Sequence, residues 1–186
     1  RHGFTCFAAA YRLGPATAPD LRGAVADAGS ALDHLAPNAA RLNIDPERLS
    51  AGGGSAGGHL AASLGAGLHG AERRRPAGLI LYNPVIDLSP CQPNHHLVRE
   101  YWQDVSPLQH IDRDFPPTLV LTGADDLEVL PASVEAFCAA VERAGGRCEA
   151  EVYASQAHGF FNYREAGNAY FDKTNERALR FLQEQL

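Results

Sequence analysis

The chain has 186 residues, of which 45% are hydrophobic and 20% charged, which is ordinary for a globular protein with ample length for a core. Its formal net charge is −6, whereas nucleic-acid-binding proteins typically have an excess of basic residues. No apolar run reaches the roughly 18 residues that a membrane-spanning helix needs. We therefore expect neither nucleic acid nor a membrane as a partner.

The first part of the chain predicts a strand, a helix and a second strand. Residues 4–11 are mostly apolar and are predicted to form a buried strand. From Leu21 to Leu35, apolar residues recur at spacings of four, three, four and three, which indicates an amphipathic helix. Residues 48–51, which follow an Asp-Pro turn, are predicted to form a short strand.

A glycine-rich stretch follows, in which Gly53-Gly-Ser55-Ala-Gly57 has the pattern G-x-S-x-G. It lies between the predicted strand at 48–51 and an apolar, helix-forming run at 60–64. This setting is typical of a nucleophile elbow, a strained turn that lifts a serine hydroxyl above a sheet. Neighbouring residues without Cβ atoms allow the strand and helix to approach closely. The alternatives are a flexible linker and a phosphate-binding loop, although the Gly-Lys-Ser/Thr of a phosphate loop is absent.

The remaining chain alternates between predicted strands and helices, which indicates an α/β fold with a mostly parallel sheet covered on both faces. Residues 87–114 lack periodicity, contain several prolines, and are predicted to form an irregular segment over the mouth of the sheet. All of residues 1–186 are assigned to a single domain. The predicted elements are strands at 78–82, 116–121 and 147–153, and helices at 131–144 and 169–185.

Three kinds of reactive side chain follow the ends of predicted strands: Ser55, the pair Asp125-Asp126, and His158. Because parallel strands end at one rim of the sheet, these residues are expected to lie together. A histidine can activate a serine hydroxyl, and a carboxylate fixes the tautomer of that histidine. We therefore predict Ser55 as nucleophile, His158 as general base and then acid, and one of the two aspartates as its partner. The alternative for the aspartates is a turn-capping role.

Other candidate residues have ordinary explanations. His59, on the helix after Ser55, is predicted to be a packed or hydrogen-bonded residue, and His95-His96 to lie in a solvated loop. Tyr101 and Trp102, in the irregular segment, could line a substrate pocket or form a small packing cluster. Cys138 and Cys148 could form a disulfide or remain two buried thiols, and the cysteine spacings give no zinc pattern.

Several motifs together resemble the α/β-hydrolase fold, and within it the acetyl-esterase and hormone-sensitive-lipase-like esterases. In chain order these are Tyr11-Arg-Leu13, Asp45-Pro46, Gly52-Gly-Gly-Ser-Ala-Gly-Gly-His-Leu-Ala61, Pro117-Thr-Leu-Val-Leu-Thr-Gly-Ala-Asp-Asp126 and His158-Gly-Phe-Phe-Asn162. The resemblance covers nearly the whole chain. It implies Asp126 as the catalytic acid, because the family places its acid three residues after the glycine that ends the strand. It also implies the backbone N–H of Ala56 as an oxyanion donor, and neither a cofactor nor a metal.

The sequence departs from the family pattern at its beginning. Family members have further strands and a His-Gly-Gly loop before the strand corresponding to residues 4–11. In the family's sheet, the strand before that loop lies between those corresponding to 4–11 and 48–52. We therefore expect this chain to be the C-terminal two-thirds of the full fold. Its sheet should then have either a gap at this position or direct pairing of the two strands.

The resemblance implies a serine esterase that cleaves small acyl or aromatic carboxylic esters through an acyl-enzyme. Acetyl or feruloyl esters of carbohydrate are candidate substrates, because the elbow and the spacing of Cys138 and Cys148 are similar to esterases that deacylate plant polysaccharides. Two alternatives remain: a serine peptidase of the same fold, and a truncated, non-catalytic hydrolase-like module.

Overall fold

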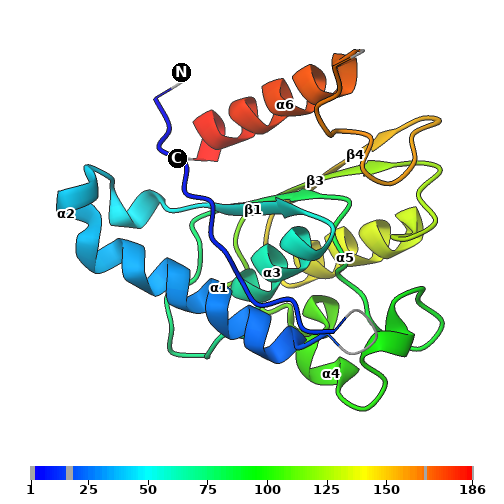
Figure 1. The fold of residues 1–186 in the computed structure, drawn as a ribbon, viewed down its shortest axis with the longest axis horizontal. Helices are drawn as coiled ribbons and strands as arrows, with labels where there is room; N and C mark the ends of the chain where they lie inside the picture. The colour runs from blue at the N-terminus through cyan, green and yellow to red at the C-terminus, as the bar shows by residue number, and fades with distance from the viewer. Residues whose placement is uncertain (1–2, 16–18, 166, 186) are drawn as a thin grey trace.

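The computed structural model describes residues 3–15, 19–165 and 167–185. A sheet of four parallel strands lies at its centre, in the spatial order β1-β2-β3-β4 (Figure 1). Each strand therefore lies next to the strand that follows it in the sequence, and all four end at the same rim. The strands are β1 (Ala51–Gly54), β2 (Leu79–Tyr82), β3 (Thr118–Gly123) and β4 (Cys148–Tyr153).

Helices cover both faces of this sheet. Figure 1 shows α1, α3 and α5 on one side and α6 alone on the other. The long helices are α1 (Leu21–Leu35), α3 (Ala56–Gly65), α5 (Pro131–Arg143) and α6 (Ala169–Gln185). The short helical turns are η1 (Ala36–Asn38), α2 (Ala39–Leu42), η2 (Pro46–Arg48), η3 (His95–Leu97), α4 (Trp102–Val105) and η4 (Pro107–His110).

The core is divided by the sheet because successive residues of a strand point to opposite faces. In β3, Val120 belongs to the cluster with α3 and α5, whereas Leu119 and Leu121 belong to the cluster with Phe181 of α6. All six residues of β3 are buried. This explains why the strand has the continuous apolar pattern of a doubly covered parallel strand.

The structure confirms most of the predicted elements. α1 covers the predicted residues, and Asp20 caps its first turn by accepting the Gly23 N–H at 2.8 Å. α5 begins at Pro131 and is followed by Gly145 at a φ of +91°, a conformation that favours glycine. A disulfide joins Cys138 of α5 to Cys148 of β4, which resolves the alternative that the sequence left open.

The strand predicted at residues 48–51 lies later in the chain than expected. Arg48 ends the turn η2, and β1 occupies Ala51–Gly54, including Gly52 and the first two glycines of the elbow motif. Glycine disfavours strands, but pairing of Ala51 with Leu79 and of Gly54 with Tyr82 fixes β1 in register with β2. Tertiary pairing therefore overrides local preference at this strand.

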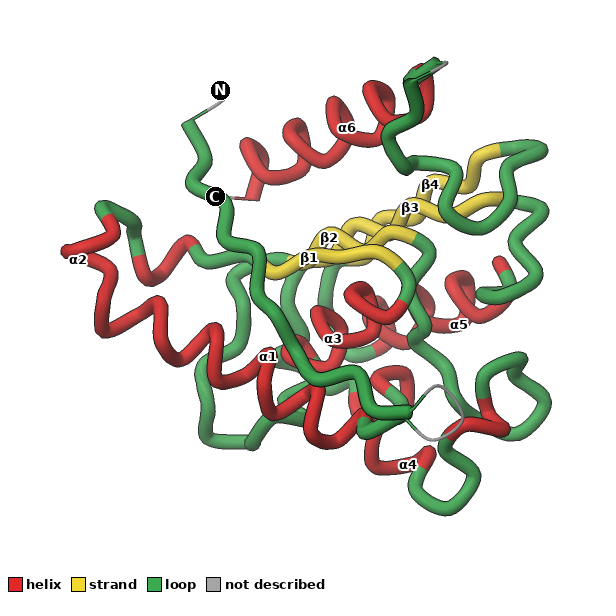
Figure 2. Tube along the Cα trace, in the orientation of Figure 1, coloured by secondary structure: helices red, strands yellow, loops and turns green. Residues whose placement is uncertain are grey.

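The strand predicted at residues 4–11 was wrong. Residues 4–15 form no strand, residues 4–10 are exposed, and Figure 2 shows them as a loop beside α1 and β1. Arg12 holds this segment to α1 through three hydrogen bonds to Asp27, one from its backbone N–H and two from its guanidinium. Between the segment and β1 lies a cavity of about 520 Å³, lined by residues that include Phe7, Tyr11 and Gly52. The segment lies across this cavity and pairs with no described strand, so β1 is an edge of the described sheet. Neither expected outcome, a gap between two strands or direct pairing of residues 4–11 with β1, is observed.

Residues 87–114 form the predicted irregular segment, with three short helical turns. Leu88, Val98 and Val105 are buried in it as a small cluster, which packs against Leu21 at the start of α1. None of the helices within the described part of the chain is long and apolar enough to cross a membrane.

Candidate active site

The nucleophile candidate Ser55 lies in a sharp turn between β1 and α3. Its backbone adopts φ 52° and ψ −114°, and its N–H donates to the Tyr82 carbonyl at 2.9 Å. The turn requires close backbone approach, because a Cβ on Gly53 would lie 2.5 Å from the Gly57 carbonyl carbon. A positive φ is uncommon for serine and stores strain at functional sites. The local geometry is therefore that of the predicted elbow.

Ser55, His158 and Asp126 form one hydrogen-bonded chain. His158 Nε2 lies 3.0 Å from Ser55 Oγ, and His158 Nδ1 lies 2.8 Å from Asp126 Oδ2. Because a carboxylate accepts and does not donate, the proton on the neutral ring belongs on Nδ1. Nε2 is then free to accept the Ser55 hydroxyl proton, which is the arrangement of a nucleophile with its base and orienter.

Asp126 is held by the backbone around it. The residue is only 1% exposed, and its Oδ1 accepts the N–H groups of Glu128 and Val129, each at 2.9 Å. Asp125, by contrast, is exposed, and only its backbone N–H is engaged, with the Gln156 carbonyl. The geometry thus separates the two aspartates and agrees with Asp126 as the acid.

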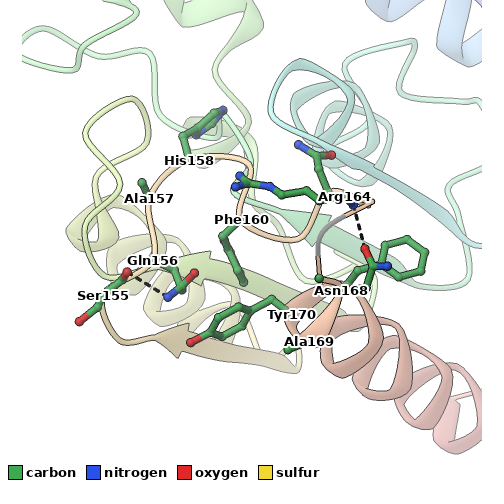
Figure 3. A pocket seen from close by; sticks show the side chains of 12 residues that line it. Ser155, Gln156, Ala157, His158, Phe160, Arg164, Asn168, Ala169 and Tyr170 are labelled. Atoms are coloured by element: carbon green, nitrogen blue, oxygen red, sulfur yellow. Dashed lines mark hydrogen bonds between the residues drawn. The ribbon is translucent and has the colours of Figure 1, made fainter.

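Ala56, the predicted oxyanion donor, is the first residue of α3 and is exposed directly after Ser55. A backbone N–H at a helix N-terminus favours negative charge. A cavity of about 580 Å³ lies beside His158, in the loop between β4 and α6 (Figure 3). His158, Phe160 and Tyr170 are among its lining residues.

Tyr101 and Trp102 occupy the packing cluster of the irregular segment. The Tyr101 hydroxyl donates to the Pro19 carbonyl at 2.8 Å, and the Arg22 guanidinium lies 4.5 Å from its ring centroid. Trp102 contacts His95 edge to face. Neither aromatic residue lines the cavity beside His158 or the one beside β1. The structure favours the packing alternative for both, and a substrate-binding role stays a prediction.

His59 is a packed residue, as predicted. It is 2% exposed, its Nδ1 donates to the Val85 carbonyl at 2.9 Å, and burial lowers its pKa to about 4. A neutral ring here fills the space beneath the elbow and ties α3 to the chain after β2. His95 and His96 each direct Nδ1 to a carbonyl of their own loop.

Sequence reasoning missed Asn83, which directly follows β2. Its side chain contacts both His158 and the backbone of Gly159. The available signal was an asparagine-proline pair at the end of a strand, on the same rim as Ser55 and His158.

A parallel sheet covered by helices, with a serine, histidine and aspartate at its carboxyl rim, defines the α/β-hydrolase class. A profile of an alpha/beta hydrolase fold family, Abhydrolase_3, matches residues 1–113. The chain therefore belongs to this family. Comparison with curated protein sequences gave no match.

Among solved structures, the chain is similar to esterase 2 of the planctomycete Thermogutta terrifontis. Its apo form superposes with a TM-score of 0.82 at 35% identity, over 94% of this chain and 69% of that one. The form phosphoramylated by tabun gives 0.79 at 36%, and the propionate-bound form gives 0.78 at 35%, each over 88% of this chain. The chain spans 65% of the length of these last two structures.

Proposed function

We propose that this chain carries the catalytic centre of a carboxylic-ester hydrolase, with Ser55 as nucleophile, His158 as general base and acid, and Asp126 as the residue that orients His158. The observation that carries the proposal is the continuous contact from Ser55 Oγ through His158 to a buried carboxylate. The similarity to T. terrifontis esterase 2 supports it, since 35–36% identity extends over 88% of this chain.

The reaction would proceed in two halves. Ser55 Oγ attacks the ester carbonyl carbon while His158 Nε2 takes the hydroxyl proton, and the Ala56 N–H stabilises the oxyanion. The intermediate collapses, and the alcohol leaves with the proton from Nε2 to give an acyl-enzyme. Water then gives a proton to Nε2 and attacks the acyl carbon. The second tetrahedral intermediate then collapses, which releases the carboxylic acid and returns the proton from Nε2 to Ser55 Oγ.

The proposed substrates are small acyl esters. The propionate- and butyrate-bound structures of the T. terrifontis enzyme support a short acyl group. For the alcohol, we propose acetyl or feruloyl esters of carbohydrate, on the resemblance of the elbow and of the Cys138 and Cys148 spacing to polysaccharide-deacylating esterases. Rates on 4-nitrophenyl acetate, propionate and butyrate, methyl ferulate and acetylated xylo-oligosaccharides rank these candidates. Faster turnover of a matched 4-nitroanilide would indicate a peptidase instead.

Fluorophosphonate labelling read by intact mass tests the nucleophile. We expect one adduct on the chain and on a Ser30→Ala control, whose serine is exposed on α1. Ser55→Ala should give none. A folded chain that gives no adduct, or an adduct that persists in Ser55→Ala, contradicts the proposal.

Asp126→Asn tests the orienting carboxylate and is expected to slow labelling and hydrolysis by about 10⁴-fold. The N–H groups of Glu128 and Val129 would keep the amide oxygen on their side. The amide NH₂ would then face His158 Nδ1 and favour the wrong tautomer. Asp125→Asn, at the exposed neighbour, should leave the rate within about twofold of the unmodified chain. Equal losses in the two variants would reject the assignment.

A further inference from the structure

Asn83 is buried at the same rim as the catalytic residues, but it has no place in the reaction described above. Its side chain is fully buried, and its backbone has a φ of +34°. Its N–H donates to the Leu121 carbonyl of β3 at 2.8 Å, which continues the sheet pairing beyond the end of β2. The residue is therefore fixed by two neighbouring strands before its side chain is considered.

The orientation of its amide follows from the backbone of the histidine loop. The Gly159 N–H donates to Asn83 Oδ1 at 2.9 Å. Because only the oxygen of the amide can accept this bond, the NH₂ group must be the one that faces His158. Asn83 Nδ2 lies 3.4 Å from His158 Nε2.

The two ring nitrogens of His158 thus face opposite kinds of partner. Asp126 offers an acceptor to Nδ1, and Asn83 offers a donor to Nε2. Glu128 Oε2 also lies 3.7 Å from Nε2, but its side chain is exposed and farther away than the buried amide of Asn83. A donor facing Nε2 favours the ring form in which that nitrogen holds a lone pair. Ser55 Oγ is the closer partner of Nε2, at 3.0 Å, so the amide lies beside the proton-transfer path and leaves it open.

We propose that Asn83 is a positioning residue that selects the Nε2-unprotonated tautomer of His158. Nε2 is thereby kept available to accept the proton of Ser55 Oγ. Once Nε2 has taken the serine proton, the amide NH₂ can no longer donate to it. The Nε2 proton is then left to the serine or leaving-group oxygen. This inference rests on the proposed hydrolase function, and its tests below are chosen to be separable from that function.

Two substitutions separate tautomer selection from simple support of the loop. Asn83→Asp retains an oxygen for the Gly159 N–H but places a second oxygen against Nε2. Asn83→Gly removes both contacts. Both residues tolerate the positive φ of this position, so the backbone is preserved. If Asn83 selects the tautomer, Asp should be the more damaging variant. If it only anchors the loop, Gly should be the more damaging one.

We expect Asn83→Asp to slow fluorophosphonate labelling by about 10²–10³-fold, within the range for disturbing a general base, and Asn83→Gly by about tenfold. For ester hydrolysis the loss should fall on kcat, with KM changed less than about threefold. A Gly variant slower than the Asp variant would overturn the proposal.

The ring tautomer can be measured without any substrate. In a chain labelled with ¹⁵N-histidine, the ring signals of His158 are assigned by their loss in His158→Gln. At pH 8, we expect Nδ1 protonated and Nε2 unprotonated, with a shift toward protonated Nε2 in Asn83→Asp. A protonated Nε2 in the unmodified chain, or identical ring spectra in the two proteins, would overturn the inference. A tautomer response in a chain that neither labels nor hydrolyses would instead reject the proposed function alone.

Discussion

The two outer strands of the sheet are secured by different means. β4 has charged side chains, Glu149 and Glu151, both paired with Arg177 of α6, and its first residue, Cys148, is cross-linked to α5. β1 consists of an alanine and three glycines and has no charged side chain. Its outer side faces a cavity of about 520 Å³ and an exposed apolar segment.

Charged side chains are a usual protection of an edge strand, and in β4 they pair with Arg177 of α6. β1 has no charged side chain, yet it leads directly into Ser55. Ser55 is therefore held by the pairing of β1 with β2 and by the close approach of α3. Backbone packing secures the catalytic edge, whereas covalent and ionic contacts secure the opposite one. Three experiments test this contrast.

The largest effect is expected from adding a methyl group at the catalytic edge. Gly53→Ala would place a Cβ 2.5 Å from the backbone of Gly57, and backbone atoms cannot move aside as a side chain could. We expect a loss of more than about 3 kcal/mol in the free energy of unfolding, measured by urea titration. Gly57→Ala is the matched control, because its Cβ would meet nothing within 4 Å. It should change stability by less than about 1 kcal/mol. Equal effects would mean that this close approach does not secure β1.

A smaller loss is expected from removing the cross-link at the opposite edge. The bridge between Cys138 and Cys148 closes a loop with a sequence separation of 10. The double variant Cys138→Ala/Cys148→Ala should lose about 2–3 kcal/mol of unfolding free energy. The double variant Cys6→Ala/Cys91→Ala changes two exposed free thiols and should stay within about 0.5 kcal/mol. Fluorophosphonate labelling of the bridge-free protein should persist while it remains folded, since the bridge lies away from Ser55.

The third experiment uses pH. The pKa of His59 falls from 6.5 to about 4 on burial, so between these values the unfolded chain binds more protons than the folded one. The stability contributed by the neutral ring is fully present above pH 6.5 and is lost as the pH falls toward 4. From pH 7.5 to pH 5, we expect His59 to account for a decrease of about 2 kcal/mol in unfolding free energy.

His59→Asn, whose amide can still donate to the Val85 carbonyl, should lack this part of the pH dependence. Urea titrations of both proteins at the two pH values measure the difference, and contributions from other groups cancel between them. If both proteins lose the same unfolding free energy between pH 7.5 and pH 5, His59 does not make the expected contribution to the pH dependence.

The sequence predicted the elements whose own residues dictate their structure. α1 follows from its apolar periodicity, and the glycine pattern around Ser55 predicted the elbow before any contact was known. The rim placement of Ser55, Asp126 and His158 follows from the direction of parallel strands alone. These predictions succeeded because each needs only local sequence and one topological rule.

The errors arose where structure depends on a partner. Residues 4–11 have the composition of a buried strand, but composition supplies no neighbour for its hydrogen bonds. β1 was displaced because its register is set by β2. Asn83 was missed because its role depends on Gly159, 76 residues further along the chain. Such pairings depend on tertiary structure, and no local sequence pattern predicts them.

At Ser55, the backbone conformation lowers the stability of the fold, whereas the side chain supplies the proposed nucleophile. A serine at a φ of 52° bears a conformational cost of about 1–3 kcal/mol, which glycine would largely avoid. A population of variants selected only for resistance to heat would therefore be drawn toward glycine at position 55 and would discard the hydroxyl. Under selection for the proposed ester hydrolysis alone, the strained serine would persist at the expense of heat resistance. Improvement of this protein for use at high temperature is better directed to positions away from the elbow.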